Sequence, residues 1–141
     1  MTESYCNITS CEMNLRVRYY EVDRQNAVHH SVYPVYFEMG RTELLRVNGY
    51  DYKVLEDKGI VLVVAKLECR YRSPARYDDE LVLKTSLEKV DRVRLDHQYE
   101  LRRINDKSLL VQGKTTLVHI DRSGKLQGLP GFLRPENYSK T

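Results

Sequence analysis

Four segments in which apolar and polar residues alternate follow one another after residue 60, with no helical pattern between them. Alternation with a period of two is typical of β-strands that bury one face. Parallel neighbours would need a crossover of a dozen or more residues, so these strands are expected to pair antiparallel. The continuous apolar run at 60–65 predicts a strand that is buried at its start. Together with an earlier alternating segment, the predicted strands span residues 13–21, 60–71, 81–87, 93–101 and 109–120.

A single long helix is expected between the first and second of these strands. Apolar and aromatic residues recur at spacings of three and four from residue 33 to 47, and Asn48-Gly49 supplies a stop signal. Ser31 is the expected N-cap, and Pro34 fits the first turn because an N–H there has no intrahelical acceptor. The expected class is therefore α+β, with one long central helix wrapped by a largely antiparallel five-stranded sheet.

The length and composition fit one globular domain over residues 1–141. Charged residues make up 30% and hydrophobic residues 41% of the 141 positions, a balance that allows a buried core. The net charge of +3 comes from mixed signs along the chain, so nucleic acid is not an expected partner. No stretch approaches the ~20 apolar residues of a membrane span, and no signal peptide is recognisable, so a soluble cytoplasmic protein is expected. Residues 1–11 and 129–141 are expected to be loosely ordered.

The most informative segment links the first strand to the helix. It holds an aspartate after the strand, a short loop, a histidine pair, and a helix with Tyr and Phe-Glu: Asp23, His29, His30, Tyr33, Phe37 and Glu38. Over about residues 15 to 45 this order resembles the signature of hot-dog-fold acyl-CoA thioesterases of the 4-hydroxybenzoyl-CoA thioesterase family. The resemblance implies a hot-dog fold, and the order of elements in that fold agrees with the order that the periodicity predicts.

Two positions depart from the family pattern. Asn26 stands where a glycine is usual, three residues after Asp23, and Val32 stands where an asparagine is usual. The first change is mild, because asparagine tolerates a positive φ better than any residue except glycine. The second change is expected to alter how the acyl group is held.

The resemblance implies hydrolysis of an acyl-CoA or acyl-carrier-protein thioester, with coenzyme A as part of the substrate and with no cofactor or metal. By the same resemblance, Asp23 is a general base towards water or a nucleophile that forms a mixed anhydride. The backbone N–H of His30 at the helix start polarises the carbonyl, since helix N-termini present unpaired N–H groups. Without the motif, an aspartate at this place is more often a turn cap than a catalyst.

Coenzyme A carries phosphates that require cationic side chains at the mouth of a groove. Arginines cluster around two predicted turns and, with residues near the helix start, complete the expected substrate-binding set: His29, Tyr33, Glu38, Arg70, Arg72, Arg76 and Arg92. Tyr71 and Tyr77 are candidates for stacking on adenine. Ordinary structural roles compete with each assignment: strand arginines are usually solvated, Tyr33 fits a core position, and Glu38 is expected to pair with Arg41.

A sheet with one face or edge uncovered favours self-association, so a homodimer or homotetramer is expected. By resemblance, the active site lies between two subunits. Cys6, Cys11 and Cys69 form an odd set that is expected to stay reduced. Two other functions stay open, a non-catalytic acyl- or CoA-binding hot-dog protein and a hot-dog hydratase or dehydratase. The sequence does not identify the acyl group.

Overall fold

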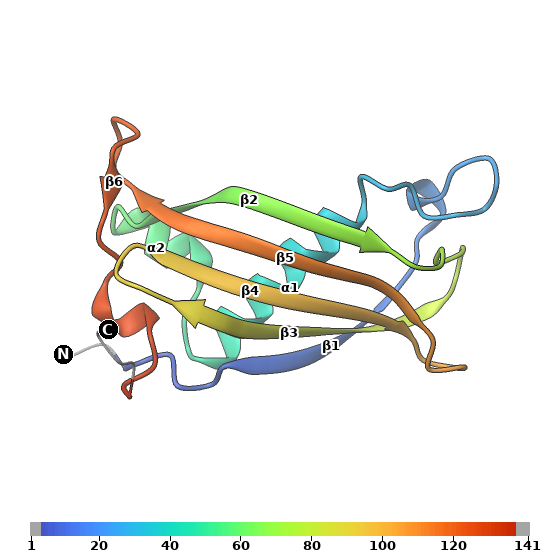
Figure 1. The fold of residues 1–141 in the computed structure, drawn as a ribbon, viewed down its shortest axis with the longest axis horizontal. Helices are drawn as coiled ribbons and strands as arrows, with labels where there is room; N and C mark the ends of the chain where they lie inside the picture. Colours follow the sequence, from blue (N-terminus) through green and yellow to red (C-terminus); the bar gives the residue numbers. More distant parts are fainter. Residues whose placement is uncertain (1–3, 138–141) are drawn as a thin grey trace.

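The computed structural model describes residues 4–137 (Figure 1). The elements are, in chain order, β1 (Ser10–Arg16), the 3₁₀ turn η1 (Tyr19–Glu21), α1 (Tyr33–Val47), α2 (Tyr52–Asp57), β2 (Val61–Tyr71), β3 (Glu80–Val90), β4 (Arg94–Arg103), β5 (Leu109–Ile120), β6 (Leu126–Gln127) and the 3₁₀ turn η2 (Gly131–Leu133). Within the described part of the chain, neither helix is long and apolar enough to cross a lipid bilayer.

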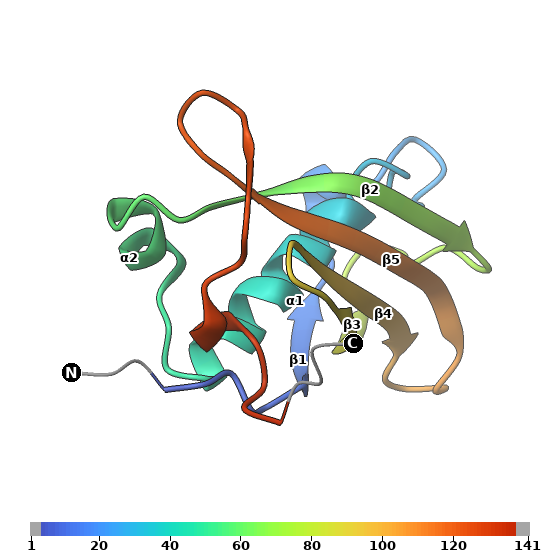
Figure 2. The same ribbon diagram turned by 60° about the vertical axis from the view of Figure 1, so that its left-hand side comes forward.

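The strands form one antiparallel sheet in the order β1-β3-β4-β5-β2, and β6 pairs with β5. β1 and β2 therefore lie at opposite edges of the sheet. α1 lies against one face, and the strands curve around it (Figure 2). The structure confirms the α+β class, the single long helix and the antiparallel sheet. The short strand β6 is an addition to the five expected strands.

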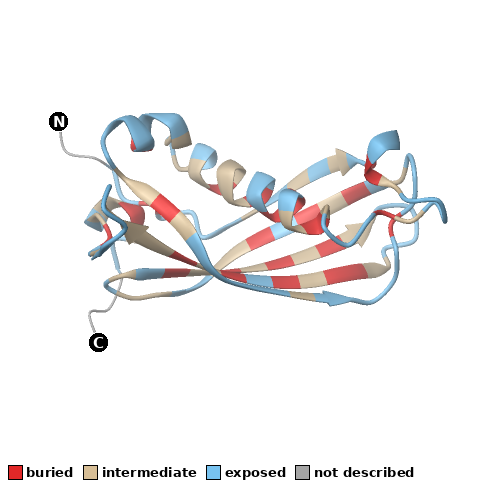
Figure 3. Ribbon diagram, turned by 90° about the horizontal axis from the view of Figure 1, so that it is seen from above, coloured by how far each residue is buried: buried red, intermediate tan, exposed pale blue. Residues whose placement is uncertain are grey.

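The core lies between α1 and the sheet (Figure 3). The buried residues of α1 are Tyr33, Tyr36, Phe37, Gly40 and Leu44. The Phe37 ring stacks on the Tyr99 ring of β4, with ring centroids 4.3 Å apart. A Cβ atom at Gly113 would strike the Phe37 ring, and a Cβ atom at Gly40 would strike the Thr85 side chain. Two glycines thus permit the close approach of α1 to the sheet.

The first strand is shorter than predicted. β1 ends at Arg16, and the chain then turns into η1 instead of continuing as a strand to residue 21. The turn forms because the Glu21 carboxylate accepts a hydrogen bond from the Arg18 backbone N–H at 2.7 Å. Asp23 therefore lies in a turn after η1 and not at the end of a strand.

Two helix starts also differ from the prediction. Periodicity does not predict α2, because six residues are too few to show a helical repeat. Asp51 caps this helix, since its side chain accepts a hydrogen bond from the Lys53 N–H at 2.8 Å. Ser31 is not the N-cap of α1. Val32 occupies that position and makes no capping side-chain hydrogen bond. The Ser31 N–H donates instead to the His29 ring at 3.2 Å.

Strand β2 is more exposed than its apolar sequence predicts. Of its residues only Leu62 is buried, whereas Val64, Leu67 and Tyr71 are each about half exposed. The reason is position, because β2 is an edge strand whose only described neighbour is β5. A row of apolar side chains therefore lines an open sheet edge.

The described parts of the two terminal segments pack against each other, which differs from the expected loose order. The Cys6 N–H donates to the Phe132 carbonyl at 2.9 Å, and the Tyr50 ring stacks on the Phe132 ring. Cys6, Leu129 and Leu133 are buried. The same expectation for residues 1–3 and 138–141 falls outside the described residues. All three cysteines are free thiols.

Candidate active site

Asp23 begins a tight loop between η1 and α1. Its N–H donates to the Ala27 carbonyl at 2.9 Å, and its Oδ1 atom accepts from the N–H groups of Gln25 at 2.8 Å and Ala27 at 3.2 Å. Within residues 4–137 the other carboxylate oxygen, Oδ2, has no hydrogen-bond partner, and the residue is exposed. One oxygen thus fixes the loop while the second faces solvent, so a structural role and a chemical role are compatible in one side chain.

His30 lies where the chain enters α1. The His29 N–H donates to the Glu21 carbonyl at 2.9 Å, and the Val32 N–H donates to the His29 carbonyl at 2.9 Å. The His30 carbonyl accepts from the Tyr71 hydroxyl at 3.1 Å. No acceptor for the His30 N–H occurs among the described residues. An exposed and unpaired amide at a helix start is the type of donor that stabilises an oxyanion.

A hollow of about 240 Å³ opens beside this amide. It is lined by Val28, His30, Tyr33, Tyr71, Arg72, Ser73 and Pro74. The rings of Tyr33 and Tyr71 lie with centroids 5.6 Å apart and form an aromatic wall. The Arg72 guanidinium is held by two hydrogen bonds to the Gln112 side-chain oxygen, at 3.0 and 2.8 Å. The hollow therefore combines an apolar surface, a free amide and a fixed positive charge.

Tyr33 connects the hollow with the Asp23 loop. Its ring is buried in the core, and its hydroxyl accepts from the Ala75 N–H at 3.2 Å. Burial is the main cause that raises the pKa of Tyr33, and the negative charge of Asp23 acts in the same direction. Tyr33 is a core residue and lines the hollow as well.

His29 stabilises the turn that leads to His30. Its Nδ1 atom lies 2.8 Å from the Ser31 hydroxyl, and the two histidine rings lie with centroids 4.2 Å apart. His29 is exposed, and its described contacts are local. Among residues 4–137 no group of three or more His, Cys, Asp or Glu side chains is arranged to hold a metal ion.

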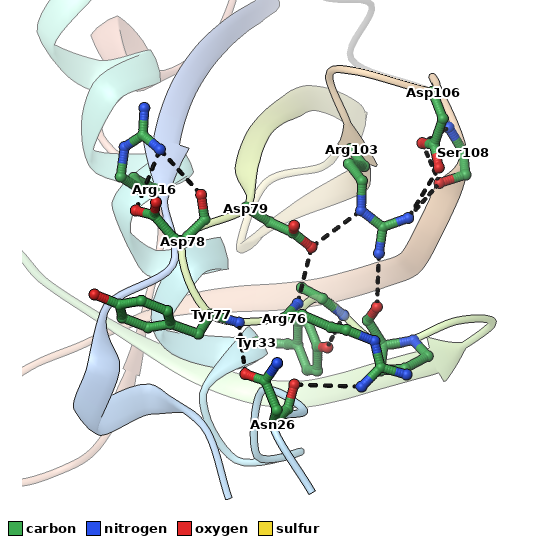
Figure 4. A network of polar contacts seen from close by, with 12 residues as sticks. Arg16, Asn26, Tyr33, Arg76, Tyr77, Asp78, Asp79, Arg103, Asp106 and Ser108 are labelled. Atoms are coloured by element: carbon green, nitrogen blue, oxygen red, sulfur yellow. Dashed lines mark hydrogen bonds and ion pairs between the residues drawn. The ribbon is translucent and has the colours of Figure 1, made fainter.

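Arg76 lies beside the Asp23 loop, in the turn between β2 and β3 (Figure 4). Its guanidinium donates to the carbonyls of Gln25 and Asn26, each at 3.4 Å. Its backbone N–H donates to the Asp79 carboxylate at 2.9 Å. The described contacts of Arg76 therefore hold the loop, although the arginine was expected to bind phosphate.

Of the expected substrate-binding residues, Tyr33 and Arg72 line the hollow, whereas Arg70 and Arg92 lie elsewhere. Arg70 points to the outer face of the sheet, where it lines a depression with Glu68, Gln98 and Lys114. Arg92 lies in the turn that follows the end of β3. The opposite end of this strand, its start, pairs with the end of β1, and the chain continues from there to Asp23. The whole length of β3 therefore separates Arg92 from the Asp23 loop.

Glu38 is exposed on α1, and it makes no ion pair with Arg41 in the described residues. The Arg41 guanidinium instead donates to the Tyr99 hydroxyl at 3.2 Å. The expected pairing is wrong because Arg41 turns toward the sheet, where the Tyr99 hydroxyl also lies 2.6 Å from the Thr115 hydroxyl.

Sequence reasoning missed Glu21, a buried carboxylate directly before the loop. Besides the Arg18 N–H, it accepts from the Tyr36 hydroxyl of α1 at 2.9 Å, and it pairs with the Arg18 guanidinium at 3.1 Å. Burial and this bond to Glu21 raise the pKa of Tyr36. Glu21 thus ties η1, the His29 segment and α1 together. The only sequence signal for Glu21 was its place within the motif, because its partner Tyr36 lies 15 residues further along the chain.

Residues 17–136 match the model of a family described as the thioesterase-like superfamily. A relative from Aquifex aeolicus is 34% identical over 116 residues, which cover 82% of this chain and 88% of the relative. The acyl-CoA thioester hydrolase YbgC of Escherichia coli is 33% identical over 81 residues, which cover 57% of this chain and 60% of YbgC.

Solved structures have the same fold. The DHNA-CoA thioesterase from Staphylococcus aureus superposes with a TM-score of 0.82 at 27% identity, over 85% of this chain and 80% of that chain. A hypothetical protein from Aquifex aeolicus superposes with a TM-score of 0.80 at 31% identity, over 85% of this chain and 93% of that chain. These similarities confirm the hot-dog fold. The chain therefore belongs to the thioesterase-like superfamily.

Proposed function

We propose that this chain hydrolyses the thioester of an acyl-CoA or acyl-carrier-protein substrate to a free acid and a thiol. One observation carries the proposal: a free carboxylate oxygen of Asp23 belongs to the same short segment as the unpaired N–H of His30, and His30 lines an aromatic hollow. A base or nucleophile and an oxyanion donor are the two parts that thioester hydrolysis requires. Membership of the superfamily supports the same reaction class.

In the proposed mechanism the thioester carbonyl oxygen accepts a hydrogen bond from the His30 N–H. Asp23 removes a proton from water while the water oxygen attacks the carbonyl carbon, and the negative charge of the tetrahedral intermediate develops towards the amide. The intermediate then breaks its carbon–sulfur bond, and the thiolate leaves and takes up the proton. In the other version, the Asp23 carboxylate attacks the carbonyl carbon directly, the carbon–sulfur bond breaks and the thiolate leaves. Water then hydrolyses the resulting mixed anhydride to the free acid and regenerates the carboxylate.

The proposed binding mode follows the lining of the hollow. The rings of Tyr33 and Tyr71 contact the acyl group, because together they form the aromatic wall of the hollow. Arg72 stands at the rim, where a guanidinium fixed by Gln112 can contact a phosphate of coenzyme A. His29 and Arg76 support the loop and the turn around this hollow.

The proposal includes a homodimer or homotetramer in which β2 pairs with a second copy. The half-exposed side chains of β2 lie at an open edge, and Tyr71 at the end of this strand lines the hollow. A second copy along β2 would cover the apolar edge and would lie next to the site.

A second candidate is a protein that binds acyl-CoA without hydrolysing it. This reading is supported by the engagement of Asp23 Oδ1 with two loop amides, which is the geometry of a structural cap. Thermal stabilisation by CoA esters without thiol release would favour it.

Thiol release from acetyl-, medium-chain, long-chain and benzoyl-type CoA esters, and from the matching carrier-protein thioesters, tests the proposal. We expect rapid release from at least one ester, with an acyl preference that reports the shape of the aromatic hollow. Lack of release from all of them by the folded protein would contradict hydrolysis and would favour the binding protein.

A further inference from the structure

Asn26 occupies the position where the related motif usually has a glycine, and its backbone has a φ of 59°. Asparagine is one of the few residues that adopt this left-handed conformation readily. The side chain also does something that a glycine cannot do, because its Oδ1 atom accepts a hydrogen bond from the Tyr77 N–H at 3.1 Å. This bond joins the Asp23 loop to residues 74–79, the turn between β2 and β3 (Figure 4).

The 74–79 turn is itself firmly anchored. Arg103 of β4, which is largely buried, donates to the Asp79 carboxylate at 3.0 Å and to the Pro74 carbonyl at 3.0 Å. The Asp78 N–H donates to the Val17 carbonyl at 3.1 Å. Bonds from both β4 and the segment after β1 therefore fix this turn, so it is a rigid support for whatever it contacts.

On the loop side, Asn26 lies between the two donors to the Asp23 carboxylate. Gln25 precedes it and Ala27 follows it, and both donate to Asp23 Oδ1. The Asn26 N–H also donates to the Asp23 carbonyl at 3.0 Å. Any displacement of Asn26 would move these donors, and the carboxylate would move with them.

We propose that Asn26 is a positioning residue that fixes the Asp23 carboxylate by joining its loop to the anchored 74–79 turn. The inference rests on the proposed thioesterase function for its catalytic consequence, but the coupling itself does not depend on activity. Asp23 is exposed, so core packing does not hold it. Its orientation therefore depends on hydrogen bonds, and the bond of Asn26 to Tyr77 is the one that the side chain at this position adds.

Asn26→Gly is the informative variant, since glycine keeps the positive φ and removes only the side-chain bond. Asn26→Asp is the conservative partner, because it tolerates the same φ and keeps an oxygen that accepts from the Tyr77 N–H. Asn105→Gly is the matched control: Asn105 is exposed in the turn after β4 and its side chain has no hydrogen bond to a described residue. Steady-state kinetics on the preferred thioester and amide hydrogen exchange are measured for all three variants.

We expect Asn26→Gly to lower kcat by about 10-fold with little change in KM, because a shift of a catalytic group of about 1 Å is costly. Amide exchange should become faster at Tyr77, Gln25 and Ala27 and stay unchanged in the strands. Asn26→Asp should retain most of the kcat, and Asn105→Gly should match the wild type.

Two results would overturn the inference. In the first, Asn26→Gly keeps the wild-type kcat and exchange rates. In the second, its effects are reproduced by Asn105→Gly or spread over the whole chain, as expected for general destabilisation. If the wild type releases no thiol from any ester, the proposed function fails, and amide exchange at Gln25 and Ala27 still decides whether Asn26 holds the loop.

Discussion

At the scale of single residues, Asp23 combines an observed structural role, the cap of its loop, with the proposed chemical role. Residue type and motif selected Asp23 and His30 from the sequence as candidates. They could not reveal that the buried Glu21 supports this segment by accepting a hydrogen bond from the Tyr36 hydroxyl of α1. That contact joins residues 15 positions apart in the chain, which no local pattern reports.

His97 of β4 is expected to make the stability of the protein depend on pH. The residue is buried, its Nδ1 atom has no hydrogen-bond partner in the described residues, and burial together with the charge of Arg41 lowers its pKa from 6.5 to about 3. The unfolded chain therefore binds a proton on this histidine more readily than the folded chain. Above pH 6.5 the histidine is neutral in both states, and as the pH falls from 6.5 towards 3 its protonation in the unfolded chain increasingly disfavours folding.

We expect the free energy of unfolding of the wild type to fall by up to roughly 1.4 kcal/mol per pH unit in this window through His97 alone. In His97→Leu this part of the slope should disappear, because leucine does not titrate and fits the leucine-rich surroundings. Urea denaturation of both proteins between pH 4 and 7 measures the difference. Parallel curves for the two proteins would contradict the assignment.

At the scale of elements, α1 and five of the strands could be predicted because their apolar residues repeat over many positions. The short elements η1 and α2 could not be predicted, since three and six residues show no repeat. The exposure of β2 was mispredicted for another reason. Whether an apolar strand is central or at an edge depends on the order of strands in the sheet, and its own sequence does not contain that order.

The close packing of α1 against the sheet allows a prediction about stability. Gly113→Ala would place a Cβ atom against the Phe37 ring, which is fully buried and stacked on Tyr99. We expect a loss of about 1–3 kcal/mol in the free energy of unfolding, the usual cost of overpacking a core. Gly124→Ala is the comparison for a glycine with open space around it, although its positive φ adds some strain of its own. Stability of Gly113→Ala equal to that of the wild type would show that the helix can shift to admit the methyl group.

At the scale of the whole molecule, the open edge at β2 is the feature that one chain leaves incomplete. We expect sedimentation equilibrium to give a mass of at least twice 16.6 kDa. Leu67→Glu should dissociate the assembly and reduce activity, because Leu67 is an exposed apolar residue of β2 and a carboxylate there would be desolvated at the interface. Leu126→Glu, at an equally exposed leucine of β6, should leave the mass unchanged. A monomeric wild type, or equal dissociation in both variants, would contradict pairing along β2.

The measurement that tests the central claim most directly compares thiol release by wild type, Asp23→Asn and Asp51→Asn. Asparagine keeps an oxygen that can accept from Gln25 and Ala27, so Asp23→Asn removes the charge and leaves the loop bonds in place. Asp51 makes the same kind of cap to the Lys53 N–H at the start of α2 and serves as the matched control. We predict that Asp23→Asn lowers kcat by about 10²- to 10⁴-fold, while Asp51→Asn retains the wild-type rate. A rate for Asp23→Asn equal to that of the wild type would reduce Asp23 to a loop cap and contradict the account.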